Sequence, residues 1–148
     1  MVATLLALAL AVPAAPKEKE KELTEAAKKD LKKLEGTWKA VKGTKDGEDM
    51  GDEDVSIEFK GRTLLLKGQE LLEVTGMDTT TDPKCIDFKA IAESGPISKG
   101  TVFEGIYKID GDTFTLALFE DGGTNRPTKF ESAKGSKVIL VTFERQKK

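Results

Sequence analysis

The chain contains no histidine, one cysteine and one tryptophan among its 148 residues. Without histidine it cannot carry a Ser-His-Asp or Cys-His catalytic group, or a zinc site that requires imidazole. One cysteine cannot form an internal disulfide or a cysteine cluster. With 24 basic and 26 acidic side chains, the net charge of −2 offers no basis for binding nucleic acid. We expect no cofactor, no metal site and no nucleic-acid partner.

Long apolar runs are also missing, because none reaches the roughly 20 residues of a membrane-spanning helix. Residues 1–16 are uncharged and mostly Ala, Leu and Val, which fits the apolar region of a secretory signal. Small residues at Val12 and Ala14 predict cleavage after Ala14, so residues 1–14 form the expected signal peptide. A misassigned start or a buried strand are the alternatives. We expect the protein to be exported, periplasmic or extracellular, with Cys85 a buried and inert thiol.

A charged linker and one short helix follow. Residues 15–23 include alternating Lys and Glu, which is typical of a solvated linker. Thr24 is a suitable helix N-cap and Gly36 a suitable residue just past the C-terminus. Four apolar residues with helical spacing share one face, namely Leu23, Ala27, Leu31 and Leu34. This narrow apolar stripe among balanced charges predicts a lid docked on the core.

Eight short segments after Gly36 are predicted to be strands. In several of them apolar and polar residues alternate, as in half-buried antiparallel strands, and the sequence Asp110-Gly111-Asp112 between two of them is a strong hairpin turn signal. The segments are Thr37–Lys42, Val55–Lys60, Thr63–Lys67, Leu71–Met77, Cys85–Ala90, Thr101–Ile109, Thr113–Phe119 and Lys137–Arg145.

This pattern predicts one all-β domain over residues 24–147, an eight-stranded antiparallel up-and-down barrel with a short N-terminal helix. A sandwich is the alternative, and the barrel is favoured because closure removes exposed sheet edges. An eight-stranded barrel is filled by its own side chains or holds one small ligand. We expect a monomer.

Gly36-Thr37-Trp38, at the start of the first strand, resembles the Gly-x-Trp signature of lipocalins and related calycins. Over residues 31–145 the chain is similar to an uncharacterised lipocalin-like domain family common in planctomycete bacteria, whose members are often exported. The resemblance implies a calycin-type barrel in which Trp38 closes one end and Arg145 stacks on the indole. It implies no activity. Many relatives carry a cysteine in the strand where this chain has Ala117. The shared elements, in order, are Leu34-Glu35-Gly36-Thr37-Trp38, Asp82-Pro83-Lys84-Cys85-Ile86-Asp87-Phe88, Gly105-Ile106-Tyr107, Asp110-Gly111-Asp112-Thr113-Phe114 and Arg126-Pro127-Thr128-Lys129-Phe130.

An acidic stretch spans residues 46–54 and includes Asp46, Glu48, Asp49 and Asp52. It fails as an EF-hand calcium loop, because Met50 and Ile57 fall where oxygen ligands are required. By topology it is the first loop between strands, which overhangs the open mouth in lipocalins. We interpret it as a solvated mouth loop that favours cationic ligands.

Other polar residues have structural interpretations that we favour over chemical ones. Asp110 and Asp112 are turn residues and not an acid–base pair. Asp87 faces solvent or, alternatively, a polar site inside the barrel. Arg126 braces its loop against an acidic neighbour or, alternatively, contacts an anion at the rim. Tyr107 packs at the edge of the core.

These observations predict a non-enzymatic exported protein that binds a small apolar or amphipathic ligand in the barrel. The alternative is an envelope protein-interaction or structural module with a filled barrel and no ligand. The low aromatic content of 6 % favours a cavity, whereas Ile57, Phe59, Leu64 and Leu66 could fill it. An enzyme that uses carboxylates is the third reading, and no acid, base and electrophile can be assembled from spacing.

Overall fold

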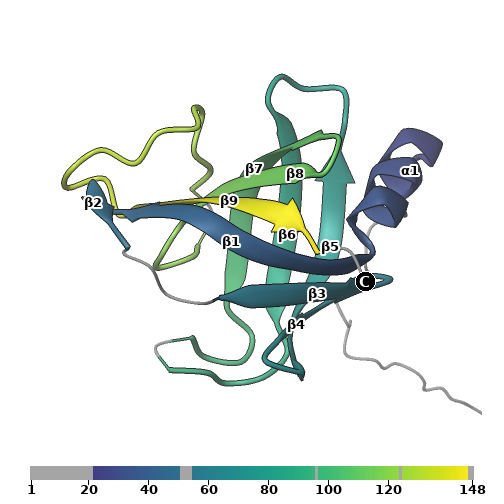
Figure 1. Cartoon of the computed structure of the whole chain (residues 1–148), viewed down its shortest axis with the longest axis horizontal. Coiled ribbons are helices and arrows are strands. Elements are labelled where there is room, and N and C mark those ends of the chain that lie inside the picture. Colours follow the sequence, from purple (N-terminus) through teal and green to yellow (C-terminus); the bar gives the residue numbers. More distant parts are fainter. Residues whose placement is uncertain (1–21, 51–54, 96, 124, 147–148) are drawn as a thin grey trace, which may run out of the picture.

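The computed structural model describes residues 22–50, 55–95, 97–123 and 125–146. One helix, α1 (Glu25–Leu34), precedes the strands (Figure 1). The strands are β1 (Gly36–Lys45), β2 (Glu48–Asp49), β3 (Ser56–Lys60), β4 (Thr63–Leu66), β5 (Gln69–Asp78), β6 (Lys84–Ala90), β7 (Val102–Asp110), β8 (Thr113–Phe119) and β9 (Val138–Arg145).

The sheet closes on itself. From β3 to β9 each strand pairs antiparallel with the next, β1 pairs with β3, and β1 also pairs with β9. The short β2 only extends the far end of β1. The predicted eight-stranded up-and-down barrel with a helix before it is therefore confirmed. Strand β1 continues three residues beyond the predicted end, because a bulge between Ala40 and Lys42 lets it keep pairing with β9.

Helix α1 covers one end of the barrel. The Thr24 side chain accepts a hydrogen bond from the Ala27 amide at 3.2 Å, which satisfies a donor that the first helical turn leaves free. The predicted apolar face is buried in the barrel core, with Ala27 and Leu34 fully inaccessible to solvent. The helix is thus the expected lid.

Aromatic rings fill the barrel beneath this lid. Phe114 lies at their centre, with its ring centroid 5.7 Å from that of Trp38, 5.8 Å from that of Phe143 and 5.9 Å from that of Phe59. The two ends of the barrel therefore differ. The end beside α1 is packed with side chains, and the strands reach a second, opposite end where the connections 91–101 and 120–137 lie.

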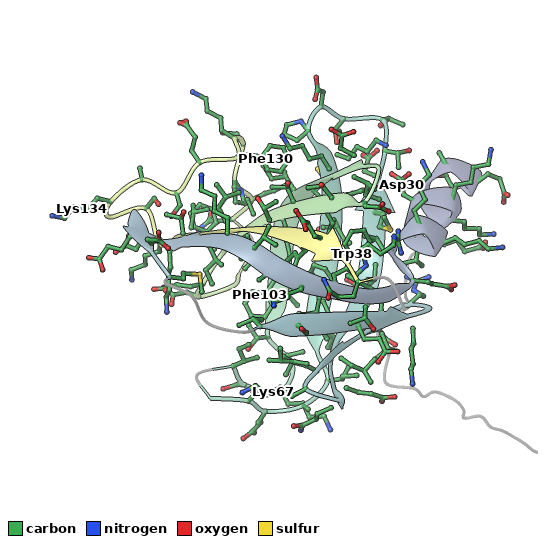
Figure 2. The ribbon with its side chains drawn as sticks, viewed as in Figure 1. Asp30, Trp38, Lys67, Phe103, Phe130 and Lys134 are labelled. Carbon is green, nitrogen blue, oxygen red and sulfur yellow. The ribbon has the colours of Figure 1, made fainter. Side chains whose placement is uncertain are left out.

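The connection 120–137 folds back over the outside of the barrel. It brings Phe130 against a small outer cluster around Ile106, Ala117 and Val138. In Figure 2, Phe130 and Lys134 mark this connection, whereas Asp30 and Trp38 lie at the end that carries α1.

Residues 1–21 and Asp52 lie outside the described residues, and with them the predicted signal peptide and most of the linker. Within the described ranges there is no helix with the length and hydropathy that a membrane-spanning segment needs.

Candidate functional site

The end beside α1 is sealed by a tryptophan–arginine pair. Trp38 and Arg145 are cross-strand partners, and the Arg145 guanidinium carbon lies 4.3 Å from the centroid of the buried indole. The indole Nε1 donates to the Leu34 carbonyl at 2.8 Å. Arg145 donates to the Glu35 carbonyl at 2.9 Å and to the Lys33 carbonyl, so its charge caps the C-terminus of α1.

Gly36 and the predicted hairpin turn complete this seal. Gly36 has a φ of 116°, and a Cβ there would lie 3.4 Å from an Arg145 nitrogen. Asp110, Gly111 and Asp112 form the β7–β8 turn, in which Gly111 has a φ of 61°. The Asp112 carboxylate lies 3.3 Å from Arg145 Nε, and its carbonyl accepts from the Arg145 amide at 2.8 Å. This turn has a structural part in the seal.

A buried carboxylate pins the lid to the barrel. Asp30 of α1 is only 5 % exposed, and its Oδ2 accepts from the Tyr107 hydroxyl at 2.8 Å and from Lys84 Nζ at 2.9 Å. Burial, and then the hydrogen bond to Asp30, raises the pKa of Tyr107 far above its ordinary value. The phenol therefore stays protonated as a donor. The expected core packing of Tyr107 is confirmed, and its polar partner is a finding of the structure.

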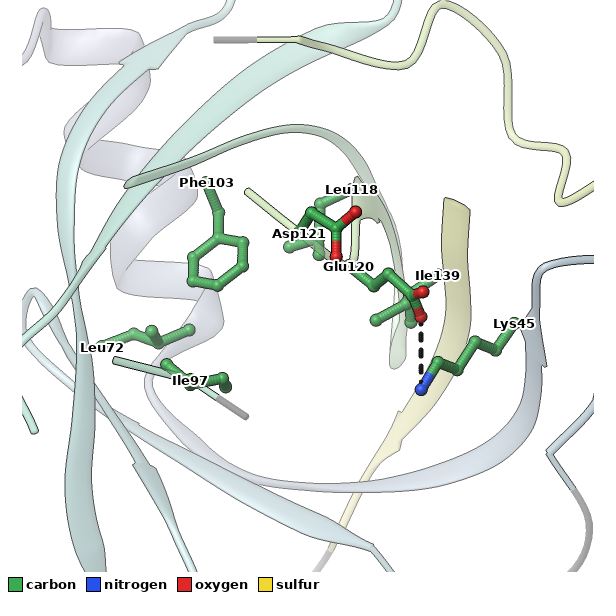
Figure 3. A pocket seen from close by; sticks show the side chains of 8 residues that line it. All are labelled: Lys45, Leu72, Ile97, Phe103, Leu118, Glu120, Asp121 and Ile139. Carbon is green, nitrogen blue, oxygen red and sulfur yellow. Dashed lines mark ion pairs between the residues drawn. The ribbon is translucent and has the colours of Figure 1, made fainter. Parts of the chain in front are cut away.

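The opposite end of the barrel contains a pocket of about 290 Å³ (Figure 3). Its wall is mainly apolar and comes from strand ends and from the connection between β6 and β7. The apolar lining residues are Leu72, Ile97, Phe103, Leu118 and Ile139. Because these side chains come from β5, β7, β8, β9 and a loop, closure of the barrel creates the pocket.

Charged side chains form the rim of this pocket. Lys45 Nζ lies 3.2 Å from a Glu120 carboxylate oxygen, an ion pair drawn as a dashed line in Figure 3. Asp121 also lines the pocket and pairs with Lys137 at 3.3 Å. The Glu120 side chain is 25 % exposed and that of Lys45 50 %, so the rim presents both an acceptor and a donor to a molecule that enters.

The described part of the predicted acidic mouth loop, residues 46–50, is not among the residues that line the pocket. Asp46 accepts from the Lys137 amide at 2.9 Å, and the Gly47 amide donates to the Ser132 hydroxyl at 3.1 Å. Glu48 and Asp49 form the exposed β2. The first inter-strand loop thus supports the connection 120–137, and the acidic groups in the pocket are Glu120 and Asp121.

Arg126 braces the connection 120–137 from outside. It lies 2.8 Å from an Asp87 oxygen and 3.4 Å from a Glu104 oxygen, and it donates to the Gly105 carbonyl at 2.8 Å. Asp87 therefore faces outward from β6. Burial lowers the pKa of Arg126, but the hydrogen bond and charge of Asp87 outweigh that effect and raise it. The interpretation of Arg126 as a loop brace is confirmed.

The prediction that Cys85 is buried is wrong. Its side chain lies on the outer face of β6 and is half-buried, because only the small outer cluster covers that part of the sheet. Its sulfur is 3.3 Å from the Thr81 hydroxyl. In the part of the chain that the structure describes, no three His, Cys, Asp or Glu side chains gather in a way that could hold a metal ion.

Sequence reasoning missed Asp30 and the charged rim. Asp30 had a usable signal, because it lies three residues after Ala27 and four before Leu34, on the apolar face of the helix. No sequence signal pointed to the rim residues Lys45, Glu120 and Asp121, since each of them ends or follows an ordinary strand.

Comparison with known proteins finds no matching family model, curated protein or solved structure.

Proposed function

We propose that this protein binds one small amphipathic molecule in the pocket at the open end of its barrel. The observation that carries the proposal is the contrast between the two ends. Rings of aromatic residues and α1 fill one end, whereas the other holds a pocket with an apolar wall and a charged rim. Burial of apolar surface would drive binding, and the rim would orient a polar group.

The pocket limits the size of the ligand. Its 290 Å³ lie at the lower end of the roughly 300–1,000 Å³ typical of small-molecule sites. A short chain or a one- or two-ring compound would fit, with its apolar part against Phe103 and Ile139. Its polar group would lie at the pair of Lys45 and Glu120. The function is binding, with no catalytic step, and the proposal includes export of the mature chain, as the family resemblance implies.

A second candidate is a structural or protein-interaction module of the cell envelope that carries no ligand. The observation in its favour is the packed half of the barrel, where the buried rings of Trp38 and Phe59 both contact that of Phe114. Under this reading the pocket is only an imperfection of packing at the mouth.

Fluorescence of the apolar probe N-phenyl-1-naphthylamine, titrated into the full chain, tests the proposal. We expect saturable binding at one site. Ile97→Trp should fill the pocket and weaken probe binding at least tenfold. The matched control is Val41→Trp, since Val41 is 51 % exposed and outside the pocket, and it should change nothing.

Native mass spectrometry of the protein purified from its own host provides the second arm. A bound small molecule that is lost in Ile97→Trp supports the proposal. If the purified protein never carries a small molecule and gives no saturable probe binding, the proposal is refuted and the structural or protein-interaction module without a ligand remains.

A further inference from the structure

A second pocket, of about 170 Å³, lies on the outer wall of the barrel. It forms where the connection 120–137 places Phe130 over the outer faces of β1, β7, β8 and β9. Polar side chains form most of its lining, which is Lys42, Thr44, Lys108, Thr115, Phe130, Leu140 and Thr142. It is separate from the pocket at the mouth, so its ligand is not the one proposed above.

Four of these residues form one row across the sheet. Lys42 is the cross-strand partner of Thr142, Thr142 of Thr115, and Thr115 of Lys108. Directly opposed residues point to the same side of a sheet, and neighbouring strands lie about 4.8 Å apart. Two hydroxyl groups therefore lie side by side, and a flexible ammonium group flanks them at each end.

The polar groups of this row have no polar partner among the described residues. Lys108 Nζ lies 5.0 Å from the centroid of the Phe130 ring, and neither lysine forms an ion pair within the described ranges. Thr115 is only 7 % exposed and lines the pocket. The Thr115 hydroxyl can therefore donate a hydrogen bond to an acceptor that enters this pocket.

Acidic groups lie nearby, in a neighbouring row of the sheet. Glu144 and Asp110 are the cross-strand partners of Thr113, which places them in the next row on the same face. That row is about 7 Å away along the strands. Among the residues that the structure describes, none of those lining the pocket carries a carboxylate.

We propose that the outer pocket binds the phosphate group of a small molecule. Lysine binds phosphate groups in proteins as a compact point charge. The threonine hydroxyls would donate to oxygens between the two charges. Phe130 and Leu140 form an apolar wall that would contact a short organic substituent. The 170 Å³ volume restricts the ligand to a compact one.

Titration of the isotope-labelled full chain with inorganic phosphate and with phenyl phosphate, followed by amide NMR shifts at constant ionic strength, tests this site. We expect saturable shifts centred on Lys42, Lys108, Thr115 and Thr142. Tighter binding of phenyl phosphate would identify a monoester as the ligand, and equal binding would identify free phosphate.

Three variants should weaken phosphate binding. Lys42→Gln and Lys108→Gln should each do so about tenfold, and Thr115→Val about threefold or more. Lys60→Gln is the matched control, because it removes the same charge from an exposed site outside the pocket and should leave binding unchanged. The same spectra show whether each variant is folded.

Three results would overturn the proposal. They are shifts that do not saturate, an effect of Lys60→Gln as large as that of Lys108→Gln, or acetate binding as tightly as phosphate.

Discussion

Single side chains at the closed end each serve several neighbours at once. Arg145 stacks on Trp38, caps two carbonyls of the helix C-terminus and pairs with Asp112. Asp30 of α1 also has several partners, since its carboxylate accepts hydrogen bonds from both Tyr107 and Lys84 of the barrel. A buried carboxylate needs such partners, because an unpaired charge in the core is strongly unfavourable.

Tyr107 is the only tyrosine, so its titration can be followed directly. Burial and the bond to Asp30 raise its pKa far above the value near 10 that it has in the unfolded chain. Above about pH 10 the unfolded state loses this proton and the folded state keeps it. The free energy of unfolding should therefore fall as pH rises, by up to about 1.4 kcal/mol per pH unit.

The measurement combines urea unfolding across alkaline pH with the ultraviolet absorbance of the phenolate. Phenolate should appear only as the barrel unfolds, and Tyr107→Phe should lack this part of the alkaline slope. A folded protein whose phenolate forms with a midpoint near pH 10 would contradict the buried hydrogen bond.

At the scale of elements, the connection 120–137 depends on one arginine. Asp87 and Glu104 are directly opposed on β6 and β7, and two like charges in that position destabilise a sheet. Arg126 lies between them and offsets this repulsion. The same contacts hold the connection beside both pockets.

We expect Arg126→Ala to lower the free energy of unfolding by about 1–3 kcal/mol, because it leaves two partly buried carboxylates facing each other. Adding Asp87→Asn to this variant should recover part of the lost stability. The free energy of unfolding of Arg126→Lys should lie between those of the parent protein and Arg126→Ala, because lysine cannot reach all three partners of Arg126. Urea unfolding followed by circular dichroism measures the double-mutant cycle. An Arg126→Ala protein within about 0.5 kcal/mol of the parent would refute the brace.

The strands could be predicted because alternation fixes which side of a strand is apolar, as in Phe114, Leu116 and Leu118 of β8. The course of the connection 120–137 could not, since it has no periodicity and depends on partners such as Asp87 that are distant in sequence. The outer pocket could not be predicted from the sequence for a related reason. Lys108 and Thr115 are ordinary outward residues until strand register aligns them.

At the scale of the whole molecule, position along the barrel axis decides between packing and binding. Phe103 and Phe114 both face the interior, yet Phe103 lines the open pocket and Phe114 lies at the centre of the filled end. Alternation in the sequence is the same for both. Closure of the β1–β9 pair sets the depth of each residue, and this information is absent from any single strand.

Trp38 tests this closure for the barrel as a whole. It is fully buried, and its strand pairs with both β3 and β9, so its loss affects the seam and the lid together. We expect Trp38→Ala to lower the free energy of unfolding by about 3–5 kcal/mol, as for other large-to-small core substitutions, while unfolding stays a single transition. Far-UV circular dichroism in urea measures both. Val41→Ala on the same strand, at a site 51 % exposed, should change stability by less than about 0.5 kcal/mol. If Trp38→Ala lowered the free energy of unfolding as little as Val41→Ala, or if it unfolded in two transitions, the indole would not hold α1 and the β1–β9 pairing together.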